Sequence, residues 1–193
     1  MASEHLERSY QAKSAEELRQ VYRDWAEHYD HELVHDLGWD KPGRVGQLLL
    51  PYLPANATIL DVGAGTGLVG QFLHDQGFRQ LSALDFSPEM LAQAKKRNVY
   101  QRFYQCDLLR PLPISQNFDA ITAVGIFTEG HVGAQVMPFL KGLLKPGGLL
   151  AFSLRDDLQD QYSRGIELFS VEKQERFSDG LESRPWSAWI CRA

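Results

Sequence analysis

The spacing of hydrophobic residues changes its period along this chain. Between Ser14 and about residue 33, apolar and aromatic residues recur at three- and four-residue steps, which predicts one face of a helix. The residues in that pattern are Leu18, Val21, Tyr22, Trp25 and Tyr29. Because Lys41-Pro42-Gly43 interrupts the pattern and Pro54 ends the next apolar run, we expect a second short helix over 45–53. Residues 1–54 are therefore predicted to form a helical cap, or lid.

From Thr58 onward, short apolar runs alternate with amphipathic segments. The runs predict strands at 58–62, 81–85, 99–105, 118–124 and 149–154. The segments between and after them predict helices at 66–76, 87–97, 132–144 and 156–165. Two further strands, 169–177 and 186–192, follow with no predicted helix between them, which favours an antiparallel edge. The expected fold class is α/β: a three-layer, doubly wound, mostly parallel seven-stranded sheet with an N-terminal helical lid.

A glycine-rich turn follows the first predicted strand. The segment Asp61-Val62-Gly63-Ala64-Gly65-Thr66-Gly67 lies where the strand passes into a helix, so the missing Cβ atoms let the backbone approach a ligand. Residues 65–70 also satisfy G-x-G-x-x-G, and Asp85 follows about 20 residues later, as in dinucleotide sites. This spacing leaves a dinucleotide and an amino-acid-bearing nucleoside both open. Asp61 favours the second ligand, because a carboxylate attracts an ammonium group and repels a pyrophosphate.

Three segments in this order are similar to class I S-adenosylmethionine-dependent methyltransferases. They are the glycine-rich turn, Leu84-Asp85-Phe86-Ser87-Pro88-Glu89-Met90-Leu91 and Leu144-Lys145-Pro146-Gly147-Gly148, within residues 59–154. The resemblance implies that the glycines lie against the methionine portion and that Asp85 accepts both ribose hydroxyls. It also implies that Asp107, with the backbone of Leu108, meets the adenine, although Asp107 equally suits a turn cap. The implied cofactor is S-adenosylmethionine, which leaves as S-adenosylhomocysteine.

The N-terminal helix carries the other predicted cofactor contacts. Many small methyltransferases of this class begin with a Trp-Ala-x-x-Tyr-Asp helix, which here lies within residues 22–30. Together with residues 37–39 and 125–131, it resembles the Williams–Beuren-region methyltransferase-like group. Aromatic rings attract a desolvated sulfonium, although packing alone also accounts for them. The predicted cofactor-binding residues are Tyr22, Trp25, Tyr29, Asp61, Gly63, Ala64, Gly65, Gly67, Asp85, Phe86, Met90, Asp107, Leu108 and Val124.

The resemblance implies in-line methyl transfer, in which the protein chiefly aligns the nucleophile, the methyl group and the sulfur. An alcohol or ammonium nucleophile needs a general base, for which the candidates are His28, Glu129 and His131. An isolated histidine in a loop also suits a surface or capping role. No spacing of histidines or cysteines predicts a metal site. We expect one domain, 1–193, with residues 55–155 as the cofactor-binding core and 156–193 as a C-terminal helix and edge strands.

Composition narrows the expected partners. The formal net charge is -5, and no dense run of Lys or Arg offers the positive surface that a phosphate backbone requires. This argues against nucleic acid and favours a small-molecule acceptor. Two cysteines and the lack of a long apolar run lead us to expect a cytoplasmic protein that does not enter a membrane. Two alternatives remain: an S-adenosylmethionine-binding sensor or partner subunit without turnover, and an NAD-dependent oxidoreductase.

Overall fold

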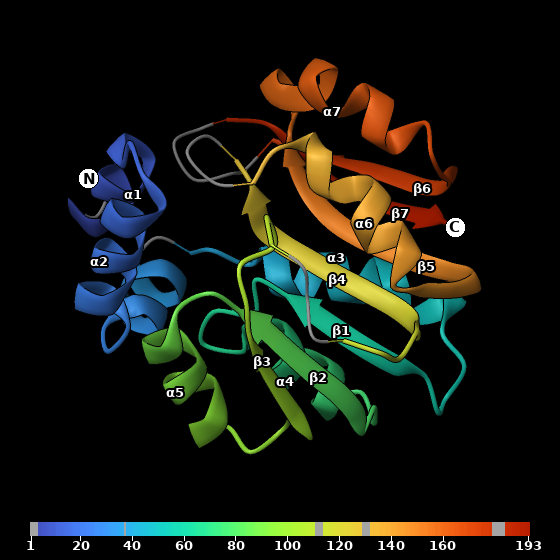
Figure 1. Ribbon diagram of the computed structural model, residues 1–193, viewed down its shortest axis with the longest axis horizontal. Coiled ribbons are helices and arrows are strands. Elements are labelled where there is room, and N and C mark those ends of the chain that lie inside the picture. The colour runs from blue at the N-terminus through green and yellow to red at the C-terminus, as the bar shows by residue number, and fades with distance from the viewer. Residues whose placement is uncertain (1–3, 37, 111–113, 129–131, 179–183) are drawn as a thin grey trace.

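One sheet organises the chain (Figure 1). The computed structural model describes residues 4–36, 38–110, 114–128, 132–178 and 184–193. The strands are β1 (Thr58–Val62), β2 (Gln80–Asp85), β3 (Arg102–Gln105), β4 (Phe118–Phe127), β5 (Leu144–Arg155), β6 (Ser170–Phe177) and β7 (Trp186–Arg192). They form a seven-stranded sheet in the order β3-β2-β1-β4-β5-β7-β6. The first five strands run parallel and β7 lies antiparallel between β5 and β6, which confirms the predicted sheet.

Helices cover both faces of the sheet (Figure 1). They are α3 (Lys41–Leu49), α4 (Leu68–Asp75), α5 (Pro88–Lys96), α6 (Met137–Gly142) and α7 (Gln159–Ile166), with short turns η2 (Leu50–Tyr52), η3 (Ala134–Val136) and η4 (Asp156–Leu158). Successive strand residues face opposite layers. In β1, Ile59 packs with α3, α4 and α5, whereas Leu60 packs with α6 and α7. None of the described helices has the length and apolar character needed to cross a membrane.

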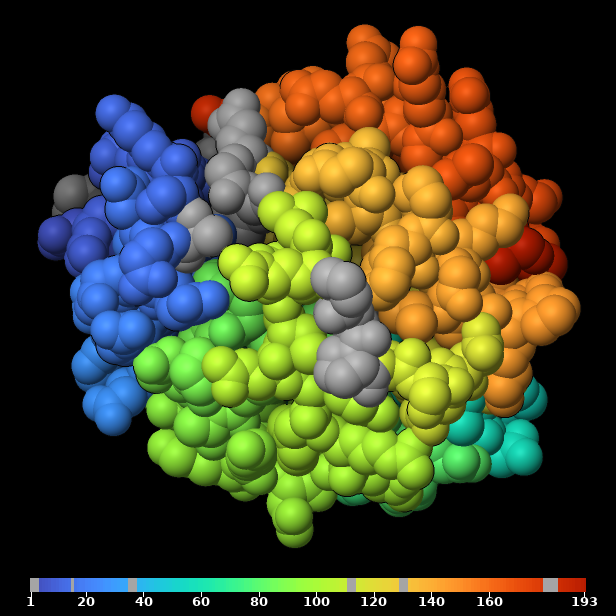
Figure 2. Space-filling view, in the orientation of Figure 1, coloured from blue at the N-terminus to red at the C-terminus, as the bar shows by residue number. Residues whose placement is uncertain are grey.

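The N-terminal helices form a lid with its own small core. Helices α1 (Glu4–Gln11) and α2 (Ala15–Trp25) pack together, and the π-helix η1 (His31–Asp36) follows them. Leu6, Trp25 and Leu33 are buried in a cluster separate from the two clusters of the sheet. Figure 2 shows this blue lobe lying against the green segment that contains α5. Arg23 in α2 pairs with Glu89 in α5 at 3.2 Å, which joins the two.

Several predicted boundaries are wrong. The periodicity misses α1, and α2 ends at Trp25 instead of continuing to residue 33. Lys41-Pro42-Gly43 was expected to separate two helices, but it forms the first turn of α3. Proline is tolerated there because the first N–H groups of a helix have no partner within the helix. Strand β5 begins at Leu144, where it pairs with Phe118, so the predicted helix 132–144 shrinks to η3 and α6.

The carboxyl end of β4 is irregular. The register between β4 and β5 shifts between Ala123 and Phe127, and Gly125 within that stretch has φ +80°. The Gly125 N–H donates to Ser153 Oγ at 2.9 Å instead of extending the ladder. A Cβ at Gly125 would lie only 3.3 Å from the ring of Trp39. The irregularity therefore brings the β4 backbone close to the lid region, as bulges next to functional sites commonly do.

Candidate functional site

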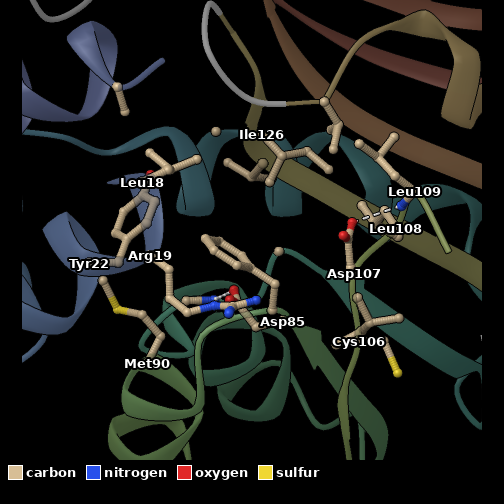
Figure 3. A pocket seen from close by; sticks show the side chains of 18 of the residues that line it. Leu18, Arg19, Tyr22, Asp85, Met90, Cys106, Asp107, Leu108, Leu109 and Ile126 are labelled. Atoms are coloured by element: carbon tan, nitrogen blue, oxygen red, sulfur yellow. Dashed lines mark hydrogen bonds between the residues drawn. The ribbon is translucent and has the colours of Figure 1, made fainter. Parts of the chain in front are cut away.

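A cavity of about 360 Å³ lies between the lid and the carboxyl ends of β1, β2 and β4 (Figure 3). This is the edge where ligands bind in open α/β sheets, and the volume falls within the range of small-ligand sites. Figure 3 shows Tyr22 entering from the lid, Met90 from α5 and Asp107 from the segment after β3. Most of the predicted cofactor-binding residues line it, namely Tyr22, Tyr29, Gly63, Gly65, Asp85, Phe86, Met90, Asp107, Leu108 and Val124.

The glycine-rich turn forms the part of the wall nearest β1. Gly63 has φ +66°, and a Cβ there would lie 2.1 Å from Cγ2 of Ile126. Gly65 has φ +54°, and a Cβ there would meet no atom within 4 Å. Gly63 is thus required for packing, whereas Gly65 keeps its backbone accessible to a ligand. Gly67 and Ala64 belong to the same turn but do not line the cavity.

Asp85 is the buried acid of the cavity. Asp85 is the last residue of β2 and is 5% exposed. Oδ2 accepts the Gly65 N–H at 2.8 Å, and Oδ1 accepts the Ser87 N–H at 2.9 Å. Burial raises the pKa of Asp85, and the hydrogen bonds from the backbones of Ser87, Gly65 and Phe86 oppose that rise. Two fixed oxygens with remaining lone pairs can accept a pair of neighbouring hydroxyl groups.

Asp61 lies behind the turn and not in the cavity. Its carboxylate accepts the Tyr100 hydroxyl at 2.5 Å and the Thr122 hydroxyl at 2.7 Å. The Tyr100 oxygen in turn accepts the N–H of Gly70, which ties the turn to the start of α4. Burial raises the pKa of Asp61 to about 6, although the hydrogen bonds from Tyr100 and Thr122 lower it. The geometry therefore gives Asp61 a bracing role and does not place it against an ammonium group.

The segment after β3 closes the opposite end of the cavity. Asp107 lines the cavity, and its Oδ1 also accepts the Leu109 N–H at 2.9 Å, so it caps the turn that follows. Leu108 lines the same wall. Met90, which is 2% exposed, approaches from α5, whose first turn is capped by Ser87 Oγ accepting the Met90 N–H. These side chains form an apolar slot with one carboxylate at its edge.

The lid contributes the aromatic wall. The ring of Tyr22 meets that of Phe86 edge to face, with centroids 6.0 Å apart. Tyr22 and Tyr29 both line the cavity, and burial raises the pKa of both phenols well above the usual value, with the Asp85 charge adding to the effect. Both tyrosines are therefore neutral near pH 7. Trp25 is only 1% exposed and stands behind them, with its centroid 4.6 Å from that of Tyr29.

The predicted general bases are not brought together in the described structure. His28 is exposed on the lid and does not line the cavity. Glu129 and His131 lie outside the described residues.

Sequence reasoning missed the contacts that fasten the lid. Asp30 accepts the Thr66 hydroxyl of the glycine-rich turn and also binds Arg97, just beyond α5. The Arg97 Nε donates to the Thr66 carbonyl at 2.7 Å, which closes the group. Asp30 is the last residue of the Trp-Ala-x-x-Tyr-Asp segment, so this motif could have indicated that Asp30 has a role in the site. Nothing local to Arg97 indicates the contact.

Arg19 of the lid was also missed. It lines the cavity, its guanidinium carbon lies 5.7 Å from the centroid of the Phe86 ring, and Figure 3 shows it extending from α2 into the site. In the sequence, Arg19 falls on the polar face of the predicted helix, so nothing indicated that its side chain points into the cavity.

The strand order, the glycine-rich turn after β1 and the buried acid that ends β2 define a class of protein, the class I S-adenosylmethionine-dependent methyltransferases. Residues 59–148, slightly less than half of the chain, match the family model described as Methyltransferase domain. The match confirms the resemblance drawn from the motifs. It also selects S-adenosylmethionine over a dinucleotide, which the G-x-G-x-x-G spacing left open.

Individual relatives agree with this assignment. Methyltransferase-like protein 27 of Homo sapiens is 40% identical over 152 residues, covering 76% of this chain and 61% of that protein. The malonyl-[acyl-carrier protein] O-methyltransferase of Enterobacter lignolyticus is 31% identical over 113 residues, covering 57% of this chain and 44% of that protein. This chain thus spans less than two thirds of either relative. The solved DhpI–SAH complex shares the fold, with a TM-score of 0.68, 18% identity and coverage of 90% of this chain and 94% of that chain.

Proposed function

We propose that this chain transfers a methyl group from S-adenosylmethionine to a small-molecule acceptor by in-line displacement. The observation that carries the proposal is the buried carboxylate of Asp85, held by the N–H groups of Gly65 and Ser87 at the base of a lidded cavity. Such an acid suits the two hydroxyls of a ribose, and it lies beside the accessible backbone of the glycine-rich turn.

The residues present fit this cofactor in three parts. Gly63 and Gly65 offer backbone to the amino-acid portion, and Asp85 accepts from the ribose. Met90 and Leu108, which line the apolar end of the cavity, would hold the adenine, and the Asp107 carboxylate would accept a hydrogen bond from its amino group. When bound, S-adenosylmethionine supplies a methyl carbon that accepts a lone pair from the acceptor while its bond to sulfur breaks toward the sulfur. The lid excludes water from this exchange, which favours the alignment that displacement requires.

A small acceptor is favoured by charge and by space. The net charge of -5 gives no general attraction to phosphate backbones. The lid contributes Tyr22 and Tyr29 to the wall of the cavity and is fastened to the glycine-rich turn through Asp30, which leaves a covered space of small-ligand size. We retain Glu129 and His131, which follow β4 directly, as the proposed bases for an alcohol or ammonium nucleophile. A pH profile of kcat for His131→Gln tests that role, because loss of a base shifts the acid limb of the profile.

Calorimetry with S-adenosylmethionine, S-adenosylhomocysteine and NADH tests cofactor choice. We expect both sulfur nucleosides to bind and NADH not to bind; the reverse order would overturn the proposal. Transfer of a labelled methyl group to a panel of metabolites then tests turnover. Binding without transfer to any member of the panel would favour the second candidate, a sensor or partner subunit, over an enzyme.

A further inference from the structure

Arg19 is a lid residue whose guanidinium is only partly engaged by the protein. It lies on α2 and lines the cavity, into which Figure 3 shows its side chain extending. Its Nη1 pairs with Glu16 on the same helix at 3.3 Å, but the Glu16 side chain is 74% exposed, so solvent screens this contact. The pair occupies one end of the guanidinium and does not involve its Nε.

The Nε atom of Arg19 is a buried donor that has no hydrogen-bond partner among the residues that the structure describes. An N–H group that is removed from water and left unpaired costs free energy, so proteins rarely keep one without an acceptor. Because Arg19 lines the cavity, a ligand bound there can supply that acceptor. The donor belongs to a permanently charged group, which makes such a hydrogen bond stronger than one between neutral groups.

The position of Arg19 relates it to the nucleoside end of the cavity. Its guanidinium carbon lies 5.7 Å from the centroid of the Phe86 ring, and Phe86 directly follows Asp85, the proposed ribose ligand. One helical turn further along α2, Arg23 pairs with Glu89 at the start of α5 at 3.2 Å. This pair holds the same face of α2 beside the segment that joins β2 to α5. Arg19 therefore approaches the part of the cavity proposed for the ribose and the adenine.

A different part of the lid meets the amino-acid end of the cavity. Asp30, which lies beyond α2, accepts the hydroxyl of Thr66 in the glycine-rich turn. That turn is the part proposed for the amino-acid portion of the cofactor. The lid thus has two regions of contact with the cofactor-binding core, and Arg19 belongs to the region at the nucleoside end.

We propose that Arg19 recognises the nucleoside portion of S-adenosylmethionine, with its Nε–H donating to an oxygen or nitrogen atom of that nucleoside. The inference rests on the proposed function and adds a lid residue to the recognition of the cofactor. Tyr22 lies on the same helix and also lines the cavity. A nucleoside that holds Arg19 therefore stabilises α2 and the aromatic wall in the closed position.

Calorimetry with two ligands separates the parts of the cofactor. S-adenosylhomocysteine has the nucleoside and the amino-acid portion, whereas methylthioadenosine keeps the nucleoside and the sulfur but lacks the amino-acid portion. Arg19→Met keeps an apolar side chain but removes the guanidinium, and it should weaken the binding of both ligands about tenfold. A loss for S-adenosylhomocysteine alone would overturn the inference and place Arg19 at the amino-acid carboxylate. Unchanged affinity for both ligands would also overturn it.

Two control variants separate ligand binding from a structural role. Glu16→Gln removes the charge that pairs with Arg19 and should leave both affinities unchanged. If Glu16→Gln reproduces the loss, Arg19 acts through the stability of α2 and the inference is wrong. Arg164→Met removes an equal charge from an exposed position on α7, outside the lining of the cavity, and should also change neither affinity. An equal loss in this variant would indicate a general effect of net charge and overturn the inference.

Amide hydrogen exchange in α2 provides a readout that needs no turnover. S-adenosylhomocysteine should slow exchange over residues 15–25 in the wild type, and this protection should be smaller in Arg19→Met saturated with the same ligand. The two proteins without ligand should exchange alike, and faster exchange in the free variant would overturn a role on the ligand. A wild type that binds neither ligand would overturn the proposed function together with this inference. Normal binding by the wild type and by Arg19→Met would overturn the inference alone.

Discussion

The two sides of the main cavity are built differently. On the sheet side, backbone N–H groups and buried acids from β1 and β2 fix the wall, as in the Gly65 and Ser87 bonds to Asp85. On the lid side, aromatic rings and a few polar contacts to the sheet, such as those of Asp30, hold a segment with its own small core. We therefore expect substitutions on the sheet side to change cofactor affinity more strongly than substitutions on the lid side.

The strongest test of the sheet side is the pH dependence of Asp61. Its pKa is raised to about 6 in the folded protein, so the native state holds a proton more tightly than the unfolded chain between about pH 4 and 6. The free energy of unfolding should therefore fall as pH rises through that window. The free energy of unfolding of Asp61→Asn should fall by about 3 kcal/mol less than that of the wild type across this pH window. Urea unfolding at several pH values measures the difference.

Asp119 provides a control of opposite sign. Its hydrogen bonds to Thr58 and Lys145 outweigh partial burial and lower its pKa, so its contribution to stability is present at neutral pH and lost in acid. Asp119→Asn should thus reduce the loss of stability in acid. Parallel pH curves for the wild type and Asp61→Asn would show that the pKa of Asp61 is not raised in the folded protein.

Gly63 tests how tightly the turn is packed against β4. Gly63→Ala should lower the free energy of unfolding by about 2 to 3 kcal/mol, because the new Cβ meets Ile126 and the backbone has a positive φ. Gly77→Ala is the matched control: its φ is +98°, but a Cβ there meets nothing within 4 Å. It should cost about 1 kcal/mol. If both variants lose the same stability, the contact with Ile126 is unimportant.

Asp85 tests the proposed ribose contact. Asp85→Asn should weaken S-adenosylhomocysteine binding by about 2 kcal/mol, or roughly 30-fold, by calorimetry. The amide loses the charge and presents an NH₂ group to a site built from backbone donors. Asp75→Asn, at an exposed position on α4, should leave the affinity unchanged. An unchanged affinity for Asp85→Asn would remove this residue from the cofactor site.

The smallest expected effect lies on the lid side. Asp30→Ala removes the contacts to Thr66 and Arg97 and should weaken S-adenosylhomocysteine binding by about 1 kcal/mol, because the partly exposed pair is screened by solvent. The melting temperature should change little, since the lid core is separate from the sheet clusters. Glu27→Ala, exposed on the same segment, is the control. A large loss of melting temperature would show that the sheet depends on the lid.

Particular residues show how far the sequence leads. The G-x-G-x-x-G spacing and the Ser87-Pro88 helix start are local features, and the structure has the turn and the cap where they predict. Asp61 was assigned to the ammonium group, but its partners Tyr100 and Thr122 come from distant segments. Side-chain direction there depends on how three elements pack, which a local pattern does not contain.

By itself, the sequence determined the alternation of strands and helices, the class of fold and the position of the glycine-rich turn, because periodicity and backbone preference act over a few residues. Only the tertiary structure decided that Asp30 reaches Arg97, that Asp61 braces the turn from behind, and that Arg19 lies over the ring of Phe86. Those contacts join residues far apart in the chain, and packing of the whole domain sets their distances.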